Sequence, residues 1–139
     1  MGRKTQKTKT QALVFDTDVL IWYFRENTKA RNLFEKTPTD QRWITSVTLM
    51  ELLQGCKNKE ELVTIQAFIA ENFSRIIHPR TSISEKAIHL VAQYSLSHGL
   101  QVIDALIASS ALLTKAGLVS GNSKHFKFIP GLLFHSFNP

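Results

Sequence analysis

The sequence contains a single cysteine, Cys56, among 139 residues. One cysteine excludes an internal disulfide and any zinc site built from several thiolates, and it suits a reducing compartment. The sequence also lacks an apolar run near the roughly 18 residues that a membrane span needs, and its first residues lack the apolar stretch of a secretory signal. We therefore expect a cytoplasmic protein that does not cross a membrane.

Basic charge is concentrated at the start of the sequence. The 17 Lys and Arg residues outnumber the 11 Asp and Glu residues, which gives a net charge of +6. Four of the basic residues are Arg3, Lys4, Lys7 and Lys9, so the rest of the chain holds 13 against 11, or +2. We predict that residues 1–11 form a disordered basic tail, which either solubilises the protein or contacts phosphates. Residues 12–139 form the single predicted domain.

Short apolar runs alternate with helical patterns after this tail. We predict strands over residues 12–16, 42–46, 75–78, 118–120 and 133–137. We predict helices over residues 18–25, 28–36, 47–56, 59–72, 82–97 and 102–115, the fifth capped by Ser82 or Ser84 and ended by Gly99. This alternation predicts an α/β fold with a mostly parallel sheet of four to five strands, covered by helices on both faces.

Acidic residues stand where predicted strands end and helices begin. Asp16 ends the first strand, Asp18 opens the next helix, Glu51 follows the second strand, and Asp104 starts the most apolar helix. Ligands of parallel sheets collect at the carboxyl ends of the strands. Carboxylates crowded at that edge would repel one another unless a cation neutralised them, and an all-oxygen site suits Mg²⁺ or Mn²⁺.

Each acid also has a purely structural interpretation. Asp16 or Asp18 could cap the first helix, and Asp104 could cap its own helix. Thr48 with Glu51 matches the S/T-x-x-E capping box. The catalytic interpretation gains weight because all of these acids lie beside apolar segments, where an ionised carboxylate is costly without compensation.

Four motifs, in order, resemble the PIN-domain ribonucleases of the VapC toxin group over about residues 12–139. The first two are D-T-x-x-L-I, which starts at Asp16, and T-S-x-T-x-x-E-L-x-x-G, which contains Glu51. The last two are D-x-x-I-A, which starts at Asp104, and L-V-[ST]-x-[ND]-x-x-x-F, which contains Asn122 and precedes I-P-G-L. Four ordered motifs are far more specific than any one of them.

The resemblance implies a PIN-like α/β/α sandwich and RNA cleavage that depends on Mg²⁺ or Mn²⁺. It also implies a toxin–antitoxin pair, inhibition by a small cognate antitoxin, and a homodimer. By position, Asp16, Glu51 and Asp104 take the metal-binding roles. Asn122 stands where the family often has a fourth acid, and no acidic residue follows Asp104. A second tightly held ion is therefore not expected, although Asp18 could replace part of the missing charge.

Several other polar residues have two open interpretations. Hydroxyl groups near the acids could orient the carboxylates or only cap helices; these are Thr17, Thr45 and Ser46. Basic residues near the motifs could contact RNA or only be solvated; these are Arg25 and Lys124. For His125, a surface or turn role is favoured over metal ligation.

Two other functions compete with RNA cleavage. The segment FDTDV resembles the D-x-D motif of haloacid-dehalogenase-type phosphatases, with Asp16 as nucleophile and Asp18 as acid. That chemistry needs a late acidic pair, which this sequence lacks. The other alternative is a degenerate PIN module that binds RNA or a partner without cleavage, in keeping with the neutral Asn122. If RNA is cleaved, loops of transfer or ribosomal RNA hairpins are plausible substrates for the family.

Overall fold

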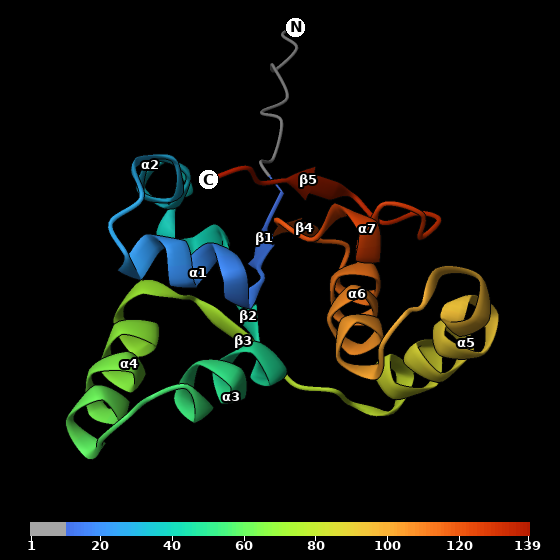
Figure 1. Ribbon diagram of the computed structural model, residues 1–139, viewed down its shortest axis with the longest axis horizontal. Coiled ribbons are helices and arrows are strands. Elements are labelled where there is room, and N and C mark those ends of the chain that lie inside the picture. Colours follow the sequence, from blue (N-terminus) through green and yellow to red (C-terminus); the bar gives the residue numbers. More distant parts are fainter. Residues whose placement is uncertain (1–10) are drawn as a thin grey trace, which may run out of the picture.

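The computed structural model describes residues 11–139, so all of the predicted basic tail except Gln11 lies outside it. A single five-stranded sheet, entirely parallel, forms its centre (Figure 1). The strand order is β3-β2-β1-β4-β5. The strands are β1 Leu13–Phe15, β2 Arg42–Thr45, β3 Arg75–Ile77, β4 Gly117–Ser120 and β5 Phe134–Ser136. The prediction of a mostly parallel sheet of four to five strands is thus confirmed.

Seven α-helices and one 3-10 helix connect these strands within residues 11–139. Their bounds are α1 Thr17–Phe24, α2 Thr28–Lys36, η1 Thr39–Gln41, α3 Ser46–Gln54, α4 Lys59–Asn72, α5 Thr81–His98, α6 Val102–Thr114 and α7 Ser123–Phe126. None of the helices within residues 11–139 combines the length and apolar composition needed to cross a membrane.

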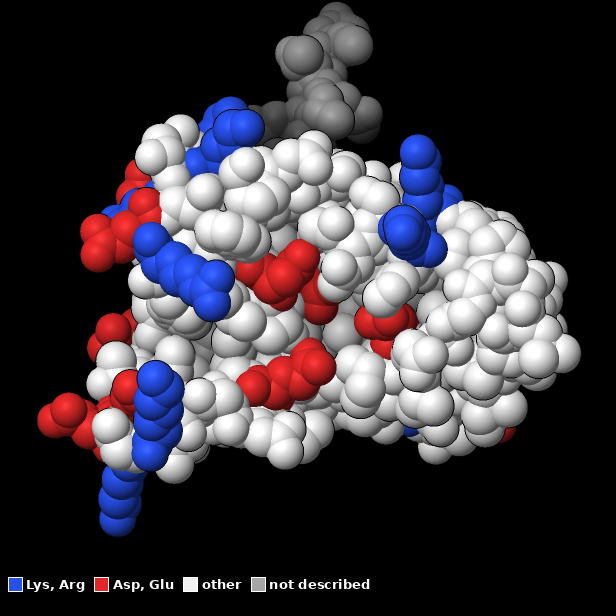
Figure 2. Space-filling view, viewed as in Figure 1, with Lys and Arg blue, Asp and Glu red and all other residues white. Residues whose placement is uncertain are grey.

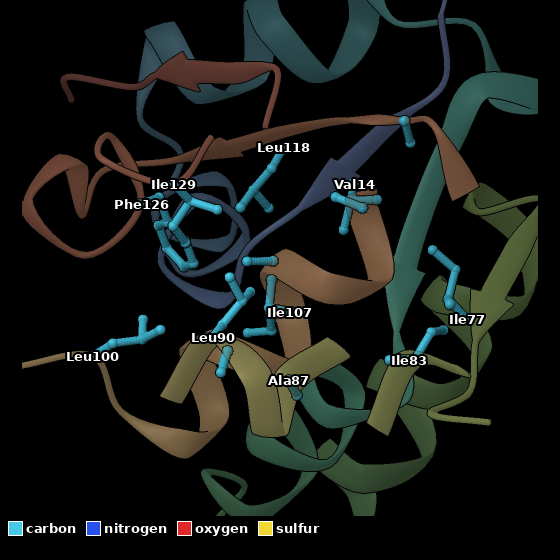
Figure 3. Packing of buried hydrophobic residues seen from close by; sticks show 14 residues of the cluster. Val14, Ile77, Ile83, Ala87, Leu90, Leu100, Ile107, Leu118, Phe126 and Ile129 are labelled. Carbon is cyan, nitrogen blue, oxygen red and sulfur yellow. The ribbon is translucent and has the colours of Figure 1, made fainter. Parts of the chain in front are cut away.

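Neighbouring residues of the central strands enter two separate hydrophobic clusters. Val14 and Leu118 pack with residues of α5 and α6, while Phe15 and Val119 pack with residues of α1, α2 and α4. Figure 3 shows the first of these clusters, to which α5 contributes Leu90 and α6 contributes Ile107. Successive side chains of a strand point to opposite faces, so the sheet is covered on both sides as an α/β/α sandwich.

Aromatic rings fill the second cluster. The Phe15 ring lies 5.7 Å from that of Phe34 and 5.8 Å from that of Phe73, both edge to face. Phe34 also contacts Tyr23, with 4.6 Å between the ring centres. Such pairs add about 0.5–1.5 kcal/mol each beyond the burial of their area. They fix α1 and α2 against the sheet, and α1 carries the candidate acid Asp18 and is capped by Asp16.

The fifth long helix differs from the prediction at its start. It begins at Thr81, because the Arg80 carbonyl already accepts a hydrogen bond from the Ser84 amide. Arg80 is the N-cap and makes no side-chain capping bond, so the prediction that Ser82 or Ser84 caps this helix is wrong. Gly99 ends the helix as predicted, with the positive φ of 67° that glycine adopts readily.

Candidate active site

Asp16 follows β1 directly and is the N-cap of α1. Its Oδ1 accepts a hydrogen bond from the Thr17 amide at 2.8 Å, and its Oδ2 accepts one from the Ser120 hydroxyl at 2.7 Å. The side chain is only 4% exposed, and this desolvation raises its pKa to about 6 despite the bond from Ser120. Asp16 is therefore a helix cap, as its structural interpretation predicted. It is also a buried carboxylate with a raised pKa, as expected of a candidate metal ligand.

Asp18 lies in the first turn of α1 and reaches across to the end of β4. Its Oδ2 accepts a hydrogen bond from the Gly121 amide at 2.8 Å. A Cβ at residue 121 would lie 2.5 Å from that oxygen, so only glycine permits this approach. The Oδ1 atom is buried and has no hydrogen-bond partner within residues 11–139. Burial raises the pKa of Asp18, as expected for a carboxylate whose charge is incompletely compensated.

Glu51 extends from α3 toward the beginning of α1. Its Oε1 accepts a hydrogen bond from the Thr17 hydroxyl at 2.5 Å. Of the two roles left open for Thr17, orienting a carboxylate or only capping a helix, the structure shows the first. The capping-box interpretation of Thr48 and Glu51 is wrong. Thr45 is the N-cap of α3, and its hydroxyl accepts the bond from the Thr48 amide. Because α3 begins at Ser46, Glu51 lies too far along the helix to reach its amino terminus.

Asp104 lies in the first turn of α6 without capping it, because Gln101 occupies the N-cap position. The Oδ2 of Asp104 lies 2.9 Å from His125 Nδ1. Desolvation raises the pKa of Asp104, the proximity of His125 opposes this shift, and the charge of Glu51 adds to it. His125 thus contacts a candidate acid, although its sequence position favoured a surface or turn role.

Asn122 is the N-cap of the short helix α7 and makes no side-chain capping bond. Its amide donates a hydrogen bond to Ser120 Oγ at 3.0 Å. The Ser120 hydroxyl therefore links Asn122 to Asp16. Ser120 is fully buried at the end of β4, which hydrogen-bonds to β1.

All the predicted acids meet around one cavity of about 190 Å³, here called the acidic cavity. Its lining residues are Asp16, Thr17, Asp18, Ile21, Glu51, Ile103, Asp104, Ile107 and Asn122. Figure 2 shows carboxylate side chains gathered near the middle of this face of the molecule. The charges of Asp18 and Asp104 each raise the pKa of Asp16, which places the three within electrostatic reach of one another.

The donors of the acidic cavity fit a divalent cation that prefers oxygen. Within residues 11–139, no three His, Cys, Asp or Glu side chains lie in an arrangement that could hold a metal ion as they stand. The cavity nonetheless offers four carboxylates and one side-chain amide, and one of the carboxylate oxygens, Oδ1 of Asp18, has no hydrogen-bond partner within residues 11–139. Raised pKa values and an unpaired buried oxygen both indicate that negative charge here is compensated incompletely by the protein.

The acids were predictable from the sequence, but two of the residues that contact them, Ser120 and His125, were not. Ser120 was visible only as the [ST] position of a motif, and no pattern connected it to Asp16, 104 residues away. Lys124, predicted to contact RNA or be solvated, lines a different cavity beside α7. Arg25 lies over the Trp22 ring at 5.6 Å.

Comparison with known proteins agrees with this architecture. The chain is similar to Ribonuclease VapC19 of Mycobacterium tuberculosis, with 28% identity over 124 residues that cover 86% of this chain and 95% of the relative. It is also similar to a solved toxin–antitoxin complex from Klebsiella pneumoniae, with 29% identity, a TM-score of 0.74, and coverage of 87% of this chain and 95% of that one.

A VapBC2 structure from Rickettsia felis bound to promoter DNA has the same fold. The TM-score is 0.74 at 23% identity, and the match covers 91% of this chain and 99% of that one. Residues 13–131 match the PIN domain family, a range that contains the whole acidic cavity. The chain therefore belongs to the PIN domain family.

Proposed function

We propose that this protein is a metal-dependent endoribonuclease that hydrolyses RNA phosphodiester bonds and acts as the toxin of a toxin–antitoxin pair. One observation carries the proposal: carboxylates from three distant segments line a single cavity at the carboxyl edge of the sheet. The names of the similar proteins, a ribonuclease and a toxin–antitoxin complex, support RNA as the substrate and an antitoxin as the partner.

Asp16, Glu51 and Asp104 would hold one Mg²⁺ or Mn²⁺ ion. Both ions favour carboxylate and water oxygens, which matches a cavity whose donors are mainly oxygens. When bound, such an ion neutralises the carboxylates, polarises a phosphate oxygen and lowers the pKa of water, which is the chemistry of phosphodiester hydrolysis. Asn122 adds no charge, so we propose one tightly held ion rather than two, with Asp18 supplying part of the missing negative charge.

Neighbouring side chains keep these ligands in place. The Ser120 hydroxyl fixes Oδ2 of Asp16, and the Thr17 hydroxyl fixes Oε1 of Glu51. His125 contacts Oδ2 of Asp104 and restricts that carboxylate in the same way. A ligand that is already oriented loses little conformational freedom on binding, so these contacts favour both ion binding and catalysis.

A groove next to the acidic cavity supports the proposed antitoxin partner. It has a volume of about 490 Å³ between α1, α3 and α4, and Ile21, Phe24 and Ile65 contribute apolar surface to it. Glu51 lines both this groove and the acidic cavity. An antitoxin segment with apolar and basic side chains would fit this surface. Competition between such a segment and RNA for the purified protein would test the assignment, and simultaneous binding would contradict it.

A second apolar surface supports the proposed homodimer. Ile88 of α5 is 67% exposed and Val102 of α6 is 62% exposed, and both line a groove of about 460 Å³. Exposed apolar surface of this kind is typical of association sites. A solution mass equal to that of a single chain would contradict the dimer.

A cleavage assay tests the central proposal. Purified protein is incubated with a structured RNA and, separately, with a small phosphate monoester, each with excess Mg²⁺ or with EDTA. We expect RNA cleavage with Mg²⁺, loss of cleavage in EDTA, and no ester hydrolysis. RNA binding without cleavage would instead identify a degenerate binding module, and ester hydrolysis alone would identify a phosphatase.

A further inference from the structure

A separate cavity of about 380 Å³, here called the basic cavity, lies beside α7. Its lining residues are His98, Ser123, Lys124, Lys127 and Phe128. It shares no residue with the acidic cavity, but it adjoins it through α7. Lys124 lines the basic cavity, while the next residue, His125, contacts Asp104 of the acidic cavity. A ligand that extends from one cavity along α7 therefore meets the other.

Stacked aromatic rings form one wall of the basic cavity. The His98 ring lies 4.1 Å from the Phe128 ring, and the two planes differ by only 19°. Tyr94 supports Phe128 from α5, with 4.9 Å between the ring centres. The Ser97 hydroxyl lies within hydrogen-bond distance of His98 Nδ1, at 2.8 Å. His98 is exposed although Phe128 stacks on its ring and Tyr94 contacts it edge to face at 5.6 Å, so part of the ring stays accessible to a planar ligand.

Positive charge forms the other wall. Lys124 and Lys127 are both exposed, and neither forms a salt bridge with an acidic side chain within residues 11–139. No Asp or Glu follows Asp104 in the sequence, so the segment that carries these lysines has no acidic residue of its own. Figure 2 shows basic side chains over the region where Figure 1 places α7, near the carboxylates in the middle of the face. These cations are therefore available to an anionic ligand.

We propose that the basic cavity binds single-stranded RNA that flanks the cleaved bond, with one base on His98 and the phosphates next to it on Lys124 and Lys127. This inference rests on the proposed ribonuclease function. Single-stranded nucleic acids are bound by this pairing of aromatic stacking with backbone-tracking cations. The lysines also place positive charge next to a strongly acidic cavity, where an RNA backbone would otherwise be repelled.

Binding measurements in EDTA test this site without cleavage. The probe is a fluorescent oligouridine of about 12 nucleotides, within the usual range of single-strand site sizes. Its affinity for the full-length protein is measured by fluorescence anisotropy across a series of salt concentrations. The variants are Lys124→Gln/Lys127→Gln and His98→Ala. The matched controls are Lys29→Gln/Lys36→Gln, which removes two exposed lysines of α2, and His98→Phe, which keeps an aromatic ring.

The two variants should both bind RNA more weakly, but with different dependence on salt. Removing both lysines should weaken binding about tenfold at low salt and reduce the slope of log affinity against log salt by about 1.4, at roughly 0.7 for each phosphate contact. His98→Ala should weaken binding about 5- to 100-fold without changing the slope, because stacking releases no counterions. His98→Phe should restore the affinity, and the α2 control should bind like the wild type.

An unchanged slope in the lysine variant, or wild-type affinity in His98→Ala, would overturn the inference. So would weaker binding of an antitoxin by the lysine variant without any change toward RNA. The melting temperatures of the lysine variant and of the α2 control should match that of the wild type, because the substituted lysines are exposed. His98→Ala loses the stack on Phe128 and should melt slightly lower, so its binding is measured well below its melting temperature. The proposed function is judged separately, because a wild-type protein that binds the probe as expected but never cleaves RNA with Mg²⁺ would contradict only the nuclease.

Discussion

The two ends of the parallel sheet carry cavities of similar size and different chemistry. The acidic cavity, at the carboxyl ends of the strands, has a volume of about 190 Å³ and four carboxylates. The cavity at the amino ends has about 230 Å³, and its described lining residues include Lys36, Gln41 and His135 but no carboxylate. Shape alone therefore does not distinguish the site. The parallel topology does, because it brings the residues that follow β1, β2 and β4 to one edge.

Burial of ionised carboxylates at the acidic end is unfavourable for the stability of the folded protein. Asp16 is almost completely buried, and its pKa is raised to about 6 because burial opposes the charged form. The same cause raises the pKa of Asp18 and Asp104. A fold selected only for stability would place apolar or neutral side chains here. These buried acids are what we expect of the cation site proposed above.

The largest expected effect comes from removing one charge at the acidic end. Asp104→Asn should lower the rate of RNA cleavage on the order of 10²-fold or more, since the ion then loses a ligand and the transition state loses stabilisation. The fold should persist, because Asn is nearly isosteric with Asp. The matched control is Asp40→Asn, an exposed acid of η1 next to Gln41 of the opposite cavity. Wild-type cleavage by Asp104→Asn would refute the assignment.

A smaller effect is expected in the stability of the protein without metal. Burial raises the pKa of Asp16 to about 6 in the folded protein, from the 3.8 of an unperturbed aspartate such as that of the unfolded chain. Between these two values the folded state holds a proton that the unfolded state has released. Protonated Asp16 therefore contributes its full share to the free energy of unfolding below about pH 4, and this share is lost as the pH rises through about 6. Asn does not titrate, so Asp16→Asn should abolish this decrease in the free energy of unfolding. In EDTA above pH 7 the variant should be more stable than the wild type by about 1–3 kcal/mol.

Urea unfolding at several pH values, in EDTA, measures this difference. The Asp40→Asn control should retain the pH dependence of the wild type. Excess Mg²⁺ should stabilise the wild type more than Asp16→Asn, because the ion neutralises the charge that the variant no longer carries. A pH profile of Asp16→Asn that coincides with that of the wild type would show that burial does not perturb Asp16.

Local sequence patterns predicted those parts of the site that depend on strand ends. Asp16 follows an apolar strand and Asp104 opens an apolar helix, and parallel topology is enough to bring such positions to one edge. The bond between Ser120 and Asp16 was not predictable in the same way. It requires β4 to lie beside β1, and the order of strands in a sheet does not follow from their order in the sequence.

The helices beside the site show the same limit. The four residues of α7 are too few to produce a helical period, so the sequence did not predict this helix or the contact of His125 with Asp104. The motif of Thr48 and Glu51 predicted a capping box, yet Thr45 lies at the start of the helix and caps it instead. The motif identified residues that could cap, but the residue at which the helix actually begins decides which of them does.

Anomalous X-ray scattering from crystals grown with Mn²⁺ tests the central claim most directly. We expect one strong manganese peak in the acidic cavity, within coordination distance of carboxylate oxygens from both Asp16 and Asp104, and no such peak in crystals of Asp16→Asn. Manganese bound only outside this cavity, or an acidic cavity without manganese at saturating concentration, would contradict it.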